Sequence, residues 1–156
     1  MKAIGFRILG RADTSELVEL HREGFDRPWD EKSILDLVAR PNTVGIGATS
    51  GNSSDLCAFV LFQRVEDEAE ILTIVVSSSE RRQGVATALL HNGEQHLSAR
   101  CCTKLFLEVA EDNVGALLLY KRLGFRVEGK RRKYYSRPGF ENIDALIMCR
   151  AITRLP

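Results

Sequence analysis

The segment that points most clearly to a chemical function runs from residue 71 to residue 90, with the sequence ILTIVVSSSERRQGVATALL. An apolar, β-branched stretch leads into a short polar loop, and the loop opens a helical apolar pattern. The first turn of a helix has unpaired backbone N–H groups and partial positive charge, so it binds phosphate readily. Arg81 and Arg82 add charge, while Gly84 and Ala86 leave the backbone accessible to a diphosphate. The segment therefore predicts a nucleotide-type cofactor held by its pyrophosphate.

Two common phosphate-binding patterns do not fit this loop. No Gly-Lys-Ser/Thr follows it, which excludes a Walker A loop, and the G-x-G-x-x-G spacing of a dinucleotide fingerprint is absent. On this segment alone, the alternative interpretation is an ordinary basic helix start.

Composition narrows the remaining functions. With 156 residues the chain has the length of one domain, and we expect residues 1–156 to form it. Lys and Arg total 22 against 21 Asp and Glu, a net charge of +1, which argues against nucleic-acid binding. No apolar run approaches the ~20 residues that span a bilayer, and the first residues do not form a signal peptide. We therefore expect no membrane partner.

Cysteines and histidines show no metal-binding pattern. The four cysteines include no CxxC pair, and His21, His91 and His96 are scattered along the chain. We expect reduced thiols, a cytoplasmic location and no metal.

Hydrophobic periodicity predicts elements in the order β-α-α-β-β-β-α-β-α-β-β, an α/β fold with a mixed sheet and helices on both faces. The unit over residues 69–109 is expected to form a right-handed parallel crossover. Asp30 and Asn113 are expected to cap helices, and Gly124 to end one in a left-handed conformation. The predicted helices are 15–23, 31–39, 84–100 and 114–123. The predicted strands are 3–9, 43–48, 56–65, 69–76 and 104–109, a strand that starts at 125–128, and a hairpin of 134–137 and 143–150.

Several motifs resemble the GCN5-related N-acetyltransferase (GNAT) family. Arg81, Gly84 and Ala86 occupy the marked positions of its R/Q-x-x-G-x-G/A acyl-CoA loop. Leu107-Glu108-Val109, Asn113 and the segment 119–125 look like its L-E-V…N…A-x-x-L-Y-x-x-x-G-F pattern. The resemblance implies the GNAT fold, with about seven strands in a mixed sheet and about four helices on its two faces.

Other motifs resemble the N-terminal acetyltransferases within this family. Pro28-Trp29-Asp30-Glu31 is similar to a P-W-[ST]-E segment between the first two helices. Residues 131–135 and 144–148 resemble an R-R-x-Y-Y…D-A-x-x-M ending. The nearest resemblance, over almost the whole chain, is to RimI-type enzymes, which acetylate the N-terminal alanine of ribosomal proteins.

The resemblance also implies catalytic roles. Glu108 lies in an apolar strand on the face opposite Leu107 and Val109, and matches the general base; a strand-edge ion pair is the alternative role. Tyr120 matches the general acid, against a plain role in the core. Glu70 is the competing base, because alternation places it on one face with Leu72, Ile74 and Val76.

The resemblance further assigns the binding residues for acetyl-CoA, the expected cosubstrate. Residues 74–76 would present backbone groups to the pantetheine, the loop 82–87 would hold the pyrophosphate, and Asn113 would both cap its helix and contact the pantetheine arm. The full predicted set is Ile74, Val75, Val76, Arg81, Arg82, Gln83, Gly84, Val85, Ala86, Thr87 and Asn113.

On the acceptor side, Phe25, Trp29, Tyr134 and Tyr135 are expected to line a peptide groove. The basic run 130–133 is expected to be a solvated turn or to attract an acidic peptide. The predicted partner is a protein N-terminus, such as that of a ribosomal protein, and the protein is expected to be a monomer or weak dimer. Two alternatives stay open: acetylation of a small amine or lysine side chain, and a non-catalytic acyl-CoA sensor.

Overall fold

The computed structural model describes residues 2–135, 139 and 142–153. These residues form seven strands and four α-helices in the order β-α-α-β-β-β-α-β-α-β-β, with two short 3-10 turns. The strands are β1 (Ile4–Ile8), β2 (Thr43–Ser50), β3 (Leu56–Val65), β4 (Glu68–Val76), β5 (Lys104–Ala110), β6 (Arg126–Tyr135) and β7 (Ile143–Ala151). The helices are α1 (Thr14–Gly24), α2 (Glu31–Val38), α3 (Val85–Ala99) and α4 (Val114–Arg122), and the 3-10 turns are η1 (Arg11–Asp13) and η2 (Ser78–Glu80).

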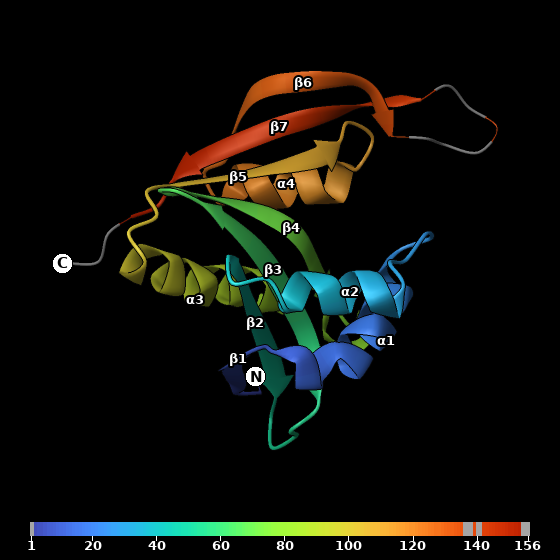
Figure 1. Ribbon diagram of the computed structural model, residues 1–156. Coiled ribbons are helices and arrows are strands. Elements are labelled where there is room, and N and C mark those ends of the chain that lie inside the picture. The colour runs from blue at the N-terminus through green and yellow to red at the C-terminus, as the bar shows by residue number, and fades with distance from the viewer. Residues whose placement is uncertain (1, 136–138, 140–141, 154–156) are drawn as a thin grey trace.

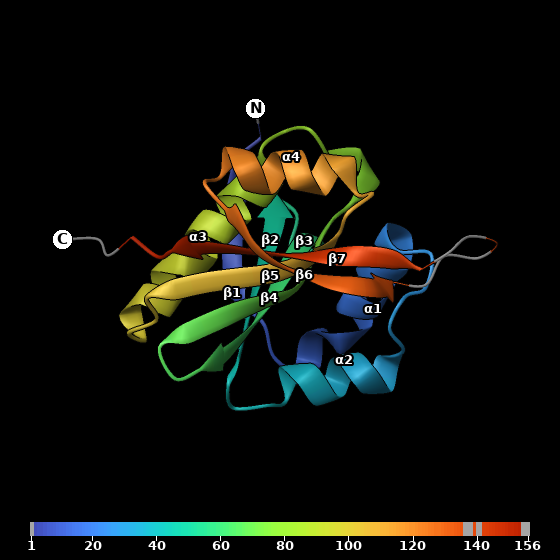
Figure 2. The same cartoon turned by 90° about the horizontal axis from the view of Figure 1, so that it is seen from above.

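All seven strands form one sheet in the order β1-β2-β3-β4-β5-β7-β6. Neighbouring strands are antiparallel except β4 and β5, which are parallel because α3 carries the chain from one to the other. Helices α1 and α2 cover one face of the sheet, and α3 and α4 cover the other (Figures 1 and 2). The predicted mixed sheet with helices on both faces is thus confirmed.

Local capping fixes two of the helix boundaries near the site. The Ser33 N–H donates to the Asp30 carboxylate at 2.8 Å and begins α2, and the Ala116 N–H donates to the Asn113 side chain at 3.2 Å and begins α4. Gly124, with φ of 89°, follows the end of α4. Both N-caps and the left-handed Gly124 were predicted from the sequence. The two capping side chains accept backbone N–H groups that have no partner within the helix.

Two apolar clusters hold the layers together, one on each face of the sheet. Leu89, Leu97 and Phe62 belong to the cluster under α3 and α4, and they are fully buried. Leu17 and Ile34 belong to the cluster under α1 and α2, and they are also fully buried. Both clusters include residues of β3 and β4, so these central strands are packed on both faces.

A β-bulge in β4 overturns the predicted alternation of this strand. The register with β3 shifts between Thr73 and Ile71, so Leu72 is an extra residue. Ile74 and Val76 pack with the α3–α4 cluster, whereas Leu72 packs with the α1–α2 cluster. Glu70 therefore shares a face with Leu72 but not with Ile74 and Val76, and the prediction that all four lie on one face is wrong.

Strands β4 and β5 separate beyond this bulge. Their parallel pairing covers only residues 68–71 of β4 and residues 104–107 of β5, although both strands continue further. The later residues of β4 therefore have backbone groups on the β5 side that pair with no strand in the described part of the chain.

The C-terminal hairpin also differs from the prediction. Residues 126–135 form the single strand β6, which pairs with β7 through two register shifts. The basic run 130–133 therefore lies within a strand and is not a turn. Irregular register hid this strand from the period-two pattern. Residues 136–137, predicted to extend the arm, lie outside the described residues.

Candidate active site

A cavity of about 420 Å³ lies where β4 and β5 separate. It is bounded by the end of β4, the loop before α3, the first turns of α4 and the end of α1. The cavity thus joins segments from four parts of the chain. Its lining residues that the sequence predicted are Phe25, Ile74, Val75, Val76, Arg81, Ala86 and Asn113.

The cavity also has lining residues that the sequence analysis missed. They are Gly24 at the end of α1, and Gly115, Ala116 and Leu119 on α4. Three of the four are glycine or alanine, so this wall is formed largely by backbone. The small pair Gly115-Ala116, in the first turn after the Asn113 cap, was the available signal, because small residues at a helix start leave room for a ligand.

The loop before α3 has the backbone geometry of an anion site. Arg82 and Gly84 have φ of 61° and 79°, and the Ala88 N–H bonds the Gly84 carbonyl at 3.0 Å as the helix begins. The N–H groups of residues 85–87 precede that bond and are free of the helical ladder. Successive amides that turn through a left-handed residue form a concave anion site. The loop therefore fits a cofactor pyrophosphate.

Side chains of this loop brace it against β4 and η2. Arg81 donates from Nε to the Val76 carbonyl at 3.0 Å, and Gln83 donates from Nε2 to the Ser79 carbonyl at 3.2 Å. Val85 is buried in the core, so only its backbone faces outward. Five predicted residues of this segment do not line the cavity, although their neighbours Arg81 and Ala86 do. They are Arg82, Gln83, Gly84, Val85 and Thr87.

Glu108 and Glu70 lie on the same face of the sheet, the face that α1 and α2 cover. Leu107 and Val109 pack under α3 and α4, which turns the Glu108 carboxylate the other way and leaves its side chain 17% exposed. Burial raises the pKa of Glu70, the Glu108 charge raises it further, and the Arg131 charge opposes both. The two carboxylates and the arginine thus form one electrostatic group.

Arg131 is a site residue that sequence analysis did not single out. Its Nε lies 3.1 Å from Oε1 of Glu108, and its guanidinium carbon lies 4.9 Å from the ring centre of Tyr134. Tyr134 is 52% exposed. A single β6 side chain therefore links a predicted base to a predicted acceptor residue. The side chain of Tyr135 lies outside the described part of the structure, although its backbone pairs with Ile143.

Tyr120 lies on α4, one turn after the cavity residue Ala116. It is 6% exposed, and its ring meets the ring of Phe125 edge-on at 5.6 Å. Arg150 places its guanidinium carbon 5.0 Å from the centre of the Phe125 ring on the same side of the sheet. Tyr120 is therefore buried close to the cavity without lining it.

The connection between α1 and α2 carries the predicted acceptor residues Phe25 and Trp29. Both rings stack on His21 of α1, at centroid distances of 4.3 and 4.7 Å. Phe25 reaches the cavity wall, whereas Trp29 packs partly against the α1–α2 cluster. Phe25 therefore lines the smaller cavity, and Trp29 does not.

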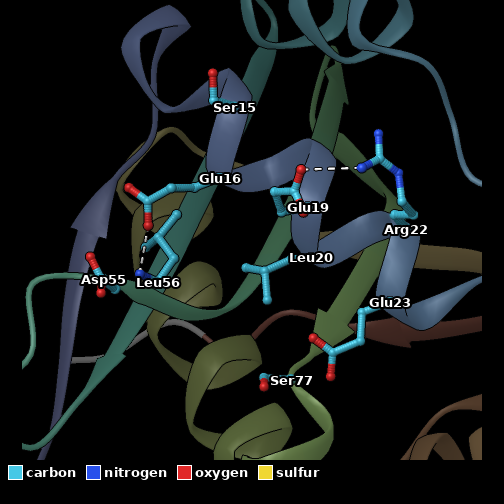
Figure 3. A pocket seen from close by; sticks show the side chains of 9 residues that line it. All are labelled: Ser15, Glu16, Glu19, Leu20, Arg22, Glu23, Asp55, Leu56 and Ser77. Carbon is cyan, nitrogen blue, oxygen red and sulfur yellow. Dashed lines mark hydrogen bonds and ion pairs between the residues drawn. The ribbon is translucent and has the colours of Figure 1, made fainter.

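A second and larger cavity, of about 660 Å³, lies along α1 (Figure 3). Two of its carboxylates already accept backbone N–H groups, Glu16 from Leu56 at 2.8 Å and Glu23 from Ser78 at 2.6 Å. An anionic cofactor would be repelled here, so this cavity is a poor site for a pyrophosphate. Its acidic lining residues are Glu16, Glu19, Glu23 and Asp55.

Comparison with known proteins agrees with this geometry. Residues 14–125, most of the chain, match the sequence profile of the Acetyltransferase (GNAT) family. The chain belongs to the GNAT acetyltransferase family. The match runs from the start of α1 to Phe125, just past the end of α4. It therefore includes every residue that lines the smaller cavity.

Two curated GNAT relatives are named for N-terminal acetylation. The [ribosomal protein bS18]-alanine N-acetyltransferase of Escherichia coli (strain K12) is 34% identical over 127 residues, 81% of this chain and 82% of the relative. The N-alpha-acetyltransferase RimI of Mycobacterium tuberculosis is 32% identical over 133 residues, 81% of each chain. This GNAT protein is therefore an N-acetyltransferase related to RimI.

Solved structures share the whole fold. The crystal structure of the E. coli ribosomal-protein-S18-alanine N-acetyltransferase matches with a TM-score of 0.88 at 28% identity, over 99% of this chain and 97% of that one. Arabidopsis thaliana NAA60 in complex with acetyl-CoA matches in fold with a TM-score of 0.81 at 23% identity, over 96% and 99%. GNAT enzymes use acetyl-CoA, and the second of these structures contains it.

No helix among residues 2–135, 139 and 142–153 is long and apolar enough to cross a membrane. Over the same part of the chain, no cluster of three or more histidine, cysteine or acidic side chains is arranged to hold a metal ion.

Proposed function

We propose that this N-acetyltransferase acetylates the N-terminal α-amine of a protein, and that its acceptor is the N-terminal alanine of a ribosomal protein. The bS18-directed name of the E. coli relative supports this choice of acceptor. The observation that carries it is the Glu108 carboxylate, which stands on the α1–α2 face at the level where β4 and β5 separate. The hairpin residue Arg131 reaches it there.

Residues around the smaller cavity would hold acetyl-CoA. Its thioester supplies the activated acetyl group. Within residues 74–76, the backbone groups on the unpaired side of β4 would bond an extended pantetheine as an added strand would. The loop residues 82–87 would hold the pyrophosphate with N–H groups, Arg81 would add positive charge, and Asn113 would contact the pantetheine arm.

Proton transfer falls to Glu108 and Tyr120. An α-amine has a pKa of about 7.7–8.0, against about 10.4 for lysine, so a carboxylate base suffices near neutral pH. Glu108 would take a proton from the acceptor ammonium, directly or through one water. The Tyr120 phenol would give a proton to the leaving sulfur. Glu70 remains the competing base, because its raised pKa brings it closer to the working pH.

Acceptor recognition would come from the two segments that flank the carboxylates. Phe25 and Trp29 lie on the α1–α2 connection, and Tyr134 and Tyr135 on the opposite hairpin strand. A peptide N-terminus that enters between them would reach the exposed edge of Glu108. The protein would work as a single domain, a monomer or weak dimer, in the cytoplasm with its cysteines reduced.

The first test is thiol release from acetyl-CoA with a panel of short acceptors. Peptides that start with Ala-Arg, Ser or Met would be compared with the same peptides blocked at the N-terminus, and with free lysine and polyamines. Turnover confined to free N-termini, highest for an N-terminal alanine, is the expected result. Turnover with small amines alone would leave the acetyl-CoA site in place and overturn the proposed acceptor. Binding of acetyl-CoA with no turnover of any amine would favour the sensor alternative.

A further inference from the structure

His21 is held between two aromatic rings in the last half of α1. Its side chain is buried, with 2% exposed, and it stacks on Phe25 at an interplanar angle of 18° and on Trp29 at 21°. Its Nδ1 also accepts the Trp29 backbone N–H at 3.2 Å. One imidazole therefore contacts both ends of the connection between α1 and α2.

The connection needs such a support, because it has no regular structure of its own. Residues 25–30 belong to neither helix, and Pro28 disfavours a helical conformation at Arg27. Phe25 leaves α1 in an extended conformation, with φ of −136° and ψ of 141°. Its 42% exposed ring nevertheless has a defined place at the cofactor cavity. The stack on His21 is the contact that ties this ring to α1.

Stability alone does not explain a histidine at this position. Since Nδ1 accepts a hydrogen bond, the neutral ring carries its hydrogen on Nε2. Nε2 is buried and has no hydrogen-bond partner in the described part of the chain. A buried, unpaired N–H disfavours folding, and a phenylalanine would fill the same space without that cost.

We propose that His21 is a positioning residue for the acceptor: it holds the α1–α2 connection so that Phe25 forms the wall between the acceptor groove and the acetyl-CoA cavity. This inference rests on the proposed peptide acceptor. The imidazole supplies two contacts that no apolar residue combines, the stack on both rings and the acceptor for the Trp29 N–H. Loss of either contact releases the connection, whereas the loop before α3 keeps its own hydrogen bonds to Val76 and Ser79.

Two variants separate the two contacts. His21→Phe keeps a stacking ring and removes the acceptor, whereas His21→Asn keeps an acceptor near the Nδ1 position and removes the stack. His91→Asn, on the exposed face of α3, is the matched control. Both His21 variants are expected to raise the KM for peptide by roughly tenfold, as the loss of one such contact would. The KM for acetyl-CoA is expected to rise less than the KM for peptide, because Phe25 is only one of the residues that line that cavity and the loop before α3 keeps its own hydrogen bonds.

Trp29 gives a readout that does not need turnover. It is the only tryptophan of the chain, so intrinsic fluorescence reports on this connection alone. Acrylamide quenching of Trp29 is expected to rise in both His21 variants and to stay at the wild-type level in His91→Asn. A rise supports the positioning role, even where the wild type turns over no peptide. That absence of turnover would count against the proposed function instead.

Other outcomes overturn the inference. Unchanged quenching together with an unchanged KM for peptide would show that His21 does not hold the connection. A parallel rise in the KM values for peptide and acetyl-CoA would show a general structural role, and so would unchanged quenching with a lowered melting temperature.

Discussion

The Nε of Arg131 lies 3.1 Å from Oε1 of Glu108, so the hairpin strand β6 supplies a cation directly to the buried-strand carboxylate. The same cation acts on Glu70, whose pKa it lowers against the effects of burial and of Glu108. One residue of β6 therefore pairs with Glu108 and lowers the pKa of Glu70. Under the proposed function, this ion pair would couple acceptor recognition to proton transfer.

Replacement of Arg131 by glutamine is expected to raise the pKa of Glu70, because the opposing positive charge is gone. More of the carboxylate is then protonated at low pH, and a protonated carboxyl is not a base. The ratio of variant to wild-type kcat/KM should therefore fall as the pH drops from about 7 to about 5. Arg131→Lys, which keeps the charge, should show a flatter ratio, and Arg132→Gln serves as the neighbouring control. A ratio independent of pH in Arg131→Gln would contradict the electrostatic link.

Replacement of Glu108 by glutamine tests the base itself. We expect kcat to fall by roughly a hundredfold, with the largest loss below about pH 8, where the acceptor amine is mostly protonated. Glu70→Gln should have a smaller effect, and Glu111→Gln, beyond the end of β5, is the control. Stopped-flow or steady-state thiol release over a pH series would measure this. A larger loss in Glu70→Gln, or the same loss at every pH in Glu108→Gln, would move the base to Glu70 or to bulk water.

Local chemistry explains which parts of the fold the sequence could predict. Asp30 and Asn113 cap their helices with hydrogen bonds to residues three positions on, so their roles are visible in the sequence itself. Gly93, an unfavourable residue inside α3, has a tertiary reason that periodicity does not show: a Cβ there would lie 2.5 Å from the Phe62 ring.

Features that depend on register could not be predicted in the same way. The extra residue Leu72 in β4 is defined only by pairing with β3, and it reverses the face of Ile74 and Val76 relative to Glu70. Arg131 meets Glu108 through an irregular β6–β7 pairing that no local pattern encodes. The spacing of His21 and Phe25, four residues apart around the end of a helix, was the one local signal for the aromatic stack.

Replacement of Tyr120 by phenylalanine is expected to lower kcat by roughly tenfold to a hundredfold through loss of the phenol proton donor. The ring would keep its edge-on contact with Phe125, so the melting temperature should change little. The KM for acetyl-CoA should stay near the wild-type value. Tyr134→Phe is the contrasting variant, since it lies on the acceptor hairpin and should act on the KM for peptide. An unchanged kcat in Tyr120→Phe would exclude Tyr120 as the acid.

Replacement of Gly84 by valine tests the anion site before α3. A Cβ at this position would meet no atom within 4 Å, so any effect comes from φ of 79° and not from a clash in the loop. A β-branched residue in that conformation costs more than the about 1–2 kcal/mol of an ordinary left-handed residue, and the loop would turn its N–H groups away. The KM for acetyl-CoA should rise by about tenfold or more.

Gly10→Val, at φ of −145° with open space around it, is the control for the Gly84 variant. Wild-type affinity in Gly84→Val would argue against the pyrophosphate site.

Acid should destabilise the wild-type protein through His21. Burial lowers the pKa of this imidazole to about 4, against about 6.5 in the unfolded chain. Above pH 6.5 neither state binds the proton, so the full stability is present. As the pH falls from 6.5 towards 4 the unfolded chain binds a proton that the folded protein does not, and the free energy of unfolding drops by up to about 1.4 kcal/mol per pH unit, about 3 kcal/mol in all.

Urea unfolding, followed by Trp29 fluorescence at several pH values, measures how the free energy of unfolding changes with pH. His21→Phe should lack that part of the slope and His91→Asn should retain it. Parallel slopes in wild type and His21→Phe would mean that His21 is not held neutral between its two rings.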